Sequence, residues 1–80
     1  MKKLSFKKFM KLVRKRFIKT NHALTKKEAL RYLRTLEALN EIKNAYESSL
    51  KEYRNGIITY KVFKIGCVSS VSYCLTYMYE

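Results

Sequence analysis

The sequence lacks most of the residues from which an active site or a metal centre is built. It contains no aspartate, one histidine (His22) and two glycines, so it offers little for acid–base catalysis and no Gly-rich phosphate-binding loop. Glu37 and Glu41 are one helical turn apart, but without histidine or cysteine nearby they make a poor metal site. We therefore expect a protein that is not an enzyme and that uses no cofactor and no metal ion.

Cysteine and long apolar runs are also scarce. Cys67 and Cys74 lack companion ligands, and the sequence shows no secretory signal pattern, so both are predicted to be reduced, small core residues of a cytoplasmic protein. The longest uncharged run, residues 65–79, has 15 residues and includes three serines and one threonine. A membrane-spanning helix needs about 20 apolar residues, so we predict no transmembrane segment.

Positive charge is what the sequence has in excess, and it is concentrated at the N-terminus. The formal net charge is +12 over 80 residues. Residues 1–27 hold eleven Lys or Arg and no acid, whereas residues 28–80 hold seven basic and six acidic residues. Such an imbalance is typical of proteins that bind a polyanion, either nucleic acid or an anionic membrane surface. A charged face kept only for solubility usually mixes both signs.

A basic amphipathic helix is predicted over residues 5–19. Its apolar residues recur at spacings of three and four and fall within an arc of about 100° on a helical wheel. They are Phe6, Phe9, Met10, Val13 and Phe17. Lysine and arginine fill the opposite side. Ser5 is the candidate N-cap, and residues 20–22 are of types that favour caps and turns.

A second, longer helix is predicted over about residues 25–55. Thr25 and Glu28 fit a capping box at its start, no Gly or Pro interrupts it, and Gly56 follows where a left-handed C-terminal cap is expected. Apolar residues alternate along it at spacings of four and three, broken only by Lys43, which is the pattern of a coiled-coil seam. The predicted dimer or core residues on this seam are Tyr32, Leu36, Leu39, Tyr46, Leu50 and Tyr53.

The seam predicts a homodimer, because it presents more apolar surface than the short first helix would cover. The alternative is that the seam packs within the chain's own core, as apolar stripes at helical spacing usually do.

A β-hairpin is predicted over about residues 57–79. The composition there changes to β-branched and aromatic residues, large and small side chains alternate from Val71 to Tyr79, and Gly66 with Cys67 would form a two-residue turn. The predicted fold class is therefore α+β, with an all-α helical hairpin as the alternative. We expect one domain, residues 1–80, made of a strongly basic helical arm (1–27) and a core and dimerisation region (28–80).

The candidate nucleic-acid-binding residues are cations of the two predicted helices. Such side chains neutralise backbone phosphates and release counterions, which gives salt-sensitive binding with little sequence readout. They are Lys7, Lys8, Lys11, Arg14, Lys15, Arg16, Lys19, Lys26, Lys27, Arg31 and Arg34. The arginines among them are the better candidates for bidentate or stacking contacts, because the guanidinium group is a planar fork.

RNA is the preferred ligand over DNA. The sequence has no zinc-finger, leucine-zipper or clear helix-turn-helix spacing, and it has many aromatic residues beside positive charge. Tyr60, Tyr73, Tyr77 and Tyr79 would stack on unpaired bases if their rings are exposed. The alternative is that these rings are buried against the second helix.

The sequence therefore predicts a small, basic protein that binds nucleic acid with little sequence specificity. Its richness in Lys, Ile, Tyr and Asn is typical of AT-rich coding sequences in phages and mobile elements. This origin favours a factor that inhibits or neutralises a host RNA-handling complex or a toxin, as an antitoxin does. Two alternatives stay open: a membrane-surface amphipathic protein, against which the narrow apolar arc without Trp counts, and a structural subunit of a ribonucleoprotein.

Overall fold

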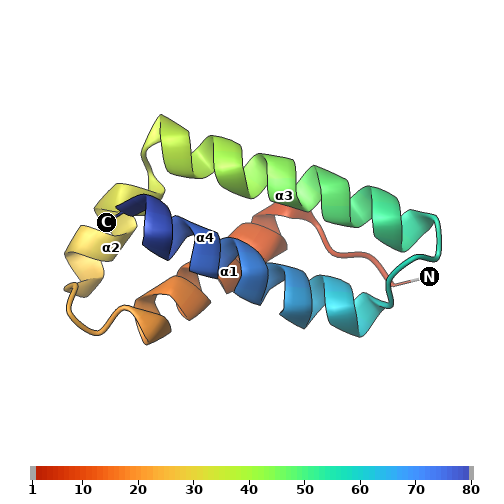
Figure 1. Ribbon diagram of the computed structural model, residues 1–80, viewed down its shortest axis with the longest axis horizontal. Coiled ribbons are helices and arrows are strands. Elements are labelled where there is room, and N and C mark those ends of the chain that lie inside the picture. Colours follow the sequence, from red (N-terminus) through yellow and green to blue (C-terminus); the bar gives the residue numbers. More distant parts are fainter. Residues whose placement is uncertain (1, 80) are drawn as a thin grey trace.

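The computed structural model describes residues 2–79, which form helices joined by short loops (Figure 1). The helices are α1 (Phe6–Thr20), α2 (Lys26–Leu33), α3 (Leu36–Arg54) and α4 (Val68–Tyr79), and a π-helical segment, η1 (Val62–Cys67), leads directly into α4. The helix formed by η1 and α4 runs antiparallel to α3, α1 crosses behind α4, and α2 closes one end of the molecule (Figure 1).

The start of α1 is confirmed where the sequence predicts it. The Ser5 hydroxyl accepts a hydrogen bond from the Lys8 backbone N–H at 3.2 Å. Phe9, Val13 and Phe17 are fully buried on one side of the helix. Beyond its end, the Asn21 side chain donates to the Phe17 carbonyl oxygen at 2.8 Å. The basic segment is therefore built into the core by its apolar side.

The single long helix predicted over about residues 25–55 is wrong, because the chain forms two helices there. The predicted capping box is confirmed: the Thr25 hydroxyl accepts from the Glu28 N–H, and the Glu28 carboxylate accepts from the Thr25 N–H, both at 3.1 Å. Thr35 then starts α3, since its hydroxyl accepts from the Ala38 N–H at 3.3 Å and donates to the Tyr32 carbonyl at 2.7 Å. A threonine that bonds to backbone groups on both sides ends one helix and caps the next without Gly or Pro.

The predicted cap after α3 is confirmed at Gly56. Gly56 has a φ of 74°, in the left-handed region. The Ile57 N–H donates to the Glu52 carbonyl at 2.9 Å, and the Gly56 N–H donates to the Tyr53 carbonyl at 3.1 Å. This pair of bonds is a Schellman motif, and it turns the chain back along α3.

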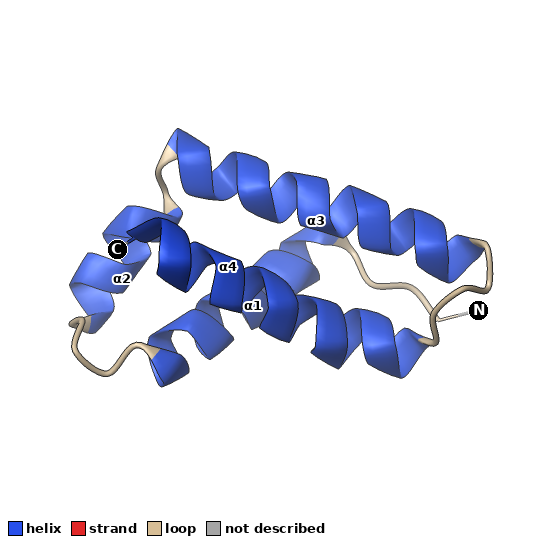
Figure 2. Cartoon of the chain, viewed as in Figure 1, coloured by secondary structure: helices blue, strands red, loops and turns tan. Residues whose placement is uncertain are grey.

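The β-hairpin predicted over about residues 57–79 is wrong, and the α+β fold class with it. No strand occurs among residues 2–79, where the structure is all-α (Figure 2). Val68, Val71, Ser72 and Leu75 are buried together, at the three- and four-residue spacing of one helix face. Burial in this segment thus follows the period of a helix and not the alternation of large and small residues, and tertiary packing outweighs the β-propensity.

The π-helical turn decides which side chain of the C-terminal helix enters the core. In a regular α-helix, Lys64 would lie one turn before the buried Val68. The wider turn of η1 puts Phe63 there instead, fully buried, and leaves Lys64 half-buried. The Phe63 ring lies 5.5 Å from that of Tyr53, 5.9 Å from that of Tyr46 and 6.0 Å from that of Phe9.

Most of the predicted seam is packed within the chain itself. Tyr32, Leu39, Tyr46, Leu50 and Tyr53 are half-buried against the core. Three of them donate hydrogen bonds to carbonyl oxygens elsewhere in the chain: Tyr32 to Leu75 at 3.2 Å, Tyr46 to Leu4 at 2.7 Å and Tyr53 to Lys2 at 2.8 Å.

Leu36 is the exception on the seam. It is 74% exposed, because the helix break at Thr35 separates it from the core. The homodimer stays a prediction, and of the seam only this side chain is left largely open to a second copy.

Candidate nucleic-acid interface

The outer side of α1 carries the predicted cations. Lys7, Lys8, Lys11, Arg14, Lys15 and Lys19 are exposed, and Arg16 is half-buried. The helix contains no acidic residue. Because Phe9, Val13 and Phe17 fix the opposite side in the core, the cations have a fixed direction relative to the rest of the fold. We call this surface the α1 basic face.

The remaining predicted cations lie on or just after α2. Lys26, Lys27, Arg31 and Arg34 are exposed. They belong to the end of the molecule that α2 closes (Figure 1). None of these four side chains lines the groove between α1 and the C-terminal helix.

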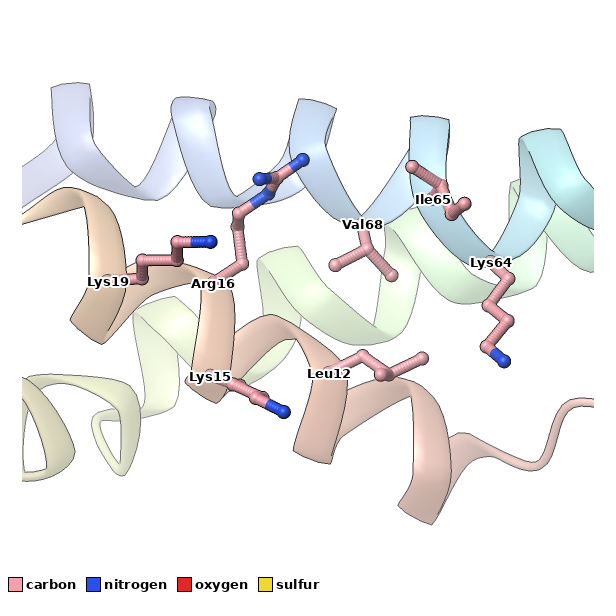
Figure 3. Close-up of a pocket in the computed structure, with 7 residues that line it drawn as sticks. All are labelled: Leu12, Lys15, Arg16, Lys19, Lys64, Ile65 and Val68. Atoms are coloured by element: carbon pink, nitrogen blue, oxygen red, sulfur yellow. The ribbon is translucent and has the colours of Figure 1, made fainter.

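A groove of about 200 Å³ lies along the surface where α1 packs against the C-terminal helix. It is lined by Leu12, Lys15, Arg16, Lys19, Lys64, Ile65 and Val68 (Figure 3). Four of these seven side chains are cationic and none is acidic. Figure 3 shows Arg16 reaching toward α4 and Lys64 pointing from η1 toward α1. Lys64 thus joins the cations of α1 because the π-helical turn keeps it out of the core.

Arg16 is the most constrained cation of the groove. Its guanidinium Nη2 donates a hydrogen bond to the Ser69 hydroxyl of α4. The side chain is half-buried, and its remaining N–H groups are donors with a fixed orientation. Such a fork suits a phosphate better than a freely rotating lysine does.

A second hollow, of about 380 Å³, lies beyond Arg16. It is lined by Arg16, Thr20, Ser69, Ser72, Tyr73 and Thr76. Because Arg16 and α4 contribute to both, the groove and the hollow adjoin along the α1–α4 junction.

One of the four tyrosines singled out from the sequence, Tyr73, lines this hollow, and Tyr77 contacts it from one helical turn further along α4. Tyr73 and Tyr77 are each 63% exposed. Their ring centroids are 5.0 Å apart at an interplanar angle of 73°, and their hydroxyl groups are hydrogen-bonded at 3.0 Å. The bond to Tyr77 raises the pKa of the Tyr73 hydroxyl. The ring contact and the hydrogen bond together restrict how the two exposed side chains can rotate.

The other two tyrosines contact rings of α3 and α2, although Tyr79 is still 43% exposed. The Tyr79 ring lies 5.0 Å from that of Tyr32, edge to face. Tyr60 is half-buried, with its ring 5.8 Å from that of Tyr53. Tyr60 also lies under the Lys2 ammonium group, which is 5.3 Å from the ring centroid. Tyr73 and Tyr77 are therefore exposed, Tyr60 is packed against the core, and Tyr79 is only partly covered.

Negative charge gathers on another side of the molecule. Among residues 2–79, all glutamates except Glu28 belong to α3. Glu41 and Glu52 face the opposite flank of α4, where they line a depression with Cys67 and Cys74. Cys74 is exposed and Cys67 half-buried, so the prediction that both are core residues is wrong for Cys74. The C-terminal helix therefore separates a cationic flank that faces α1 from a flank that faces Glu41 and Glu52 of α3.

Several residues of this surface were missed by sequence reasoning. Lys64, Ser69 and Ser72 were assigned to a hairpin, so nothing connected them with α1. The available signal was the helical spacing of Val68, Val71 and Leu75, which places Ser69 and Tyr73 together on a neighbouring flank.

Comparisons with protein-family models, with curated proteins and with solved structures find no match to this chain. Within residues 2–79, no helix combines the length and the apolar character that a membrane crossing requires. The same residues bring together no group of three or more histidine, cysteine or acidic side chains that could hold a metal ion.

Proposed function

We propose that the protein binds nucleic acid without catalysing a reaction, RNA in preference to DNA, through the α1 basic face and the groove beside it. One observation carries the proposal: the apolar side of α1 is fixed in the core, so that six of its seven lysines and arginines are exposed, with no acid among them. Because the backbone of α1 is already ordered, a row of cations along it can contact a row of phosphates without the entropy cost of ordering a flexible tail.

The length of α1 suits a backbone ligand. Its 15 residues span about 22 Å at 1.5 Å per residue. Six of its cations are exposed along this length, so the helix can contact about six phosphates of one strand. Lysine outnumbers arginine thirteen to five in the sequence, which favours contacts to phosphates over base readout.

The membrane-surface alternative is weaker on this fold. An interfacial helix needs its apolar side for the acyl chains. Phe9, Val13 and Phe17 are fully buried, so α1 would have to leave the core to use them. A structural subunit of a ribonucleoprotein uses the same phosphate contacts and belongs to the same proposal. A mobile-element factor that coats RNA, or that inhibits a host RNA-handling complex or toxin, also belongs to this proposal, and the composition of the sequence favours that setting.

Gel-shift titration of charge-reversal variants tests the proposal. Lys11→Glu/Lys15→Glu changes two exposed residues of the α1 basic face, whereas Lys43→Glu/Lys51→Glu changes two exposed lysines of α3. Both double variants lower the net charge equally. The α1 variant should lose binding to single-stranded RNA at moderate salt, and the α3 variant should bind nearly as well as the original protein. Equal losses in the two variants would show that net charge, and not α1, attracts the RNA.

A further inference from the structure

The hollow beyond Arg16 contains a buried hydroxyl that has no partner. Ser72 is 2% exposed, and among the described residues its Oγ is the buried side-chain oxygen without a hydrogen bond. The neighbouring hydroxyl groups are paired: Thr76 donates to the Ser72 carbonyl at 3.1 Å, and Thr20 donates to the Arg16 carbonyl at 3.0 Å. An unsatisfied buried polar group is costly, and Ser72 lines the hollow, so a ligand in the hollow that reaches this hydroxyl would supply the missing partner.

The outer wall of the same hollow is aromatic. Tyr73 lines it, and Tyr77 holds the Tyr73 hydroxyl from one helical turn away. Stacking on an exposed aromatic ring is open to every nucleobase, because each base has a π-face. A base edge also carries the donors and acceptors that Ser72 lacks.

Phosphate contacts are available directly beside the hollow. Arg16 lines both the hollow and the groove, and Lys15, Lys19 and Lys64 continue from it along the groove. A strand that places one base in the hollow would therefore run its backbone along these cations. A base within a duplex is paired and stacked, so it is not free to enter.

We propose that the hollow formed by Arg16, Ser72 and Tyr73 receives an unpaired nucleobase, and that the protein binds its nucleic acid as a single strand. The inference rests on the proposed function and adds the ligand class: a single strand with an accessible base, its phosphates on Arg16 and the lysines of the groove.

The test compares two strands of equal charge. One is a short single-stranded RNA of mixed bases, and the other carries the same number of phosphates on an abasic backbone. Fluorescence anisotropy measures the dissociation constant of each at one salt concentration. Stacking of one base on an aromatic ring contributes about 1–3 kcal/mol, so the base-bearing strand should bind about 5- to 140-fold more tightly.

Three variants locate the effect. Tyr73→Leu/Tyr77→Leu should remove the preference for the base-bearing strand and leave affinity for the abasic strand unchanged, whereas Tyr73→Phe/Tyr77→Phe should keep most of the preference. Ser72→Ala should reduce the preference without lowering the melting temperature, because the hydroxyl has no partner to lose. Thermal melting of each variant confirms that it is folded.

The outcomes separate this inference from the proposed function. If the original protein binds both strands equally tightly, no base enters the hollow, while the phosphate interface stands. If Tyr73→Leu/Tyr77→Leu and Ser72→Ala both still prefer the base-bearing strand, the base binds elsewhere, and the hollow is not its site. If neither strand binds, the proposed function itself is wrong.

Discussion

Truncating Phe63 to alanine tests the packing that brings Lys64 into the groove. Phe63 is fully buried, with three aromatic rings within 6.0 Å of its own. Removing a buried phenylalanine ring costs about 3–5 kcal/mol, and lost ring–ring contacts favour the upper half of that range. A chain of 80 residues has roughly 4–12 kcal/mol of total stability, so Phe63→Ala should lose a third of it or more.

Urea denaturation followed by far-UV circular dichroism measures this loss. With an m-value of about 1 kcal/mol per M, a loss of about 4 kcal/mol lowers the midpoint by about 4 M, or unfolds the variant in buffer. Leu36→Ala is the matched control on the predicted seam, because Leu36 is 74% exposed and should change stability by less than about 0.5 kcal/mol.

A smaller loss of stability in Phe63→Ala than in Leu36→Ala would refute the π-helical register. If Phe63→Ala costs less than about 1 kcal/mol, Phe63 is not one turn from Val68 in the core, and Lys64 does not point toward α1 as described. A large loss of stability in Leu36→Ala would show that Leu36 is packed in the core, as the continuous seam predicted from the sequence requires.

Four further predictions concern the glycines, the N-cap of α2 and assembly. Gly66→Ala should stabilise the protein by about 0.5–1 kcal/mol in thermal melts, since the added Cβ meets only a Val62 methyl at an ordinary 3.5 Å, whereas Gly56→Ala should destabilise it by about 1–2 kcal/mol because φ is 74° there. Thr25→Ala should cost about 1 kcal/mol by removing the N-cap. Hydrogen bonds from the Thr25 backbone and side chain lower the pKa of Glu28 below its ordinary 4.5, so their contribution is present above that pH and is lost as the pH falls through the lowered pKa. Melts of Glu28→Gln should lack this dependence, and an identical acid profile in both proteins would contradict it. Light scattering decides the homodimer: a mass near 9.6 kDa that stays constant on concentrating rules it out, and twice that mass confirms it.

Local signals in the sequence predicted the first helix and most of the caps. Ser5, Thr25 and Gly56 act on backbone groups within a few residues, so their roles follow from neighbours that the sequence shows directly. The break at Thr35 was missed because a threonine in the middle of a helical pattern is compatible with either state. Ala38, three residues on, completes no capping box that would have indicated a second start.

Non-local packing determined the parts of the fold and of the candidate interface that the sequence did not predict. The segment after Gly56 has β-propensity and an alternating pattern, yet it pairs with α1 and α3 as a helix because Phe63, Val71 and Leu75 fill their core. The cations of α1 were therefore predictable, whereas the contributions of Lys64 and Ser72 depend on a π-helical turn and on the crossing of α1 behind α4. Neither has a signature in the local sequence.

The salt dependence of RNA binding tests the central claim most directly. If the α1 basic face contacts about six phosphates, the logarithm of the binding constant should fall against the logarithm of salt concentration with a slope of about −4 for single strands and about −5 for B-DNA. Lys11→Glu/Lys15→Glu should make the slope markedly shallower, while Lys43→Glu/Lys51→Glu should leave it unchanged. A slope near −1 for the original protein would contradict the account, because binding would then not depend on a row of phosphates along α1.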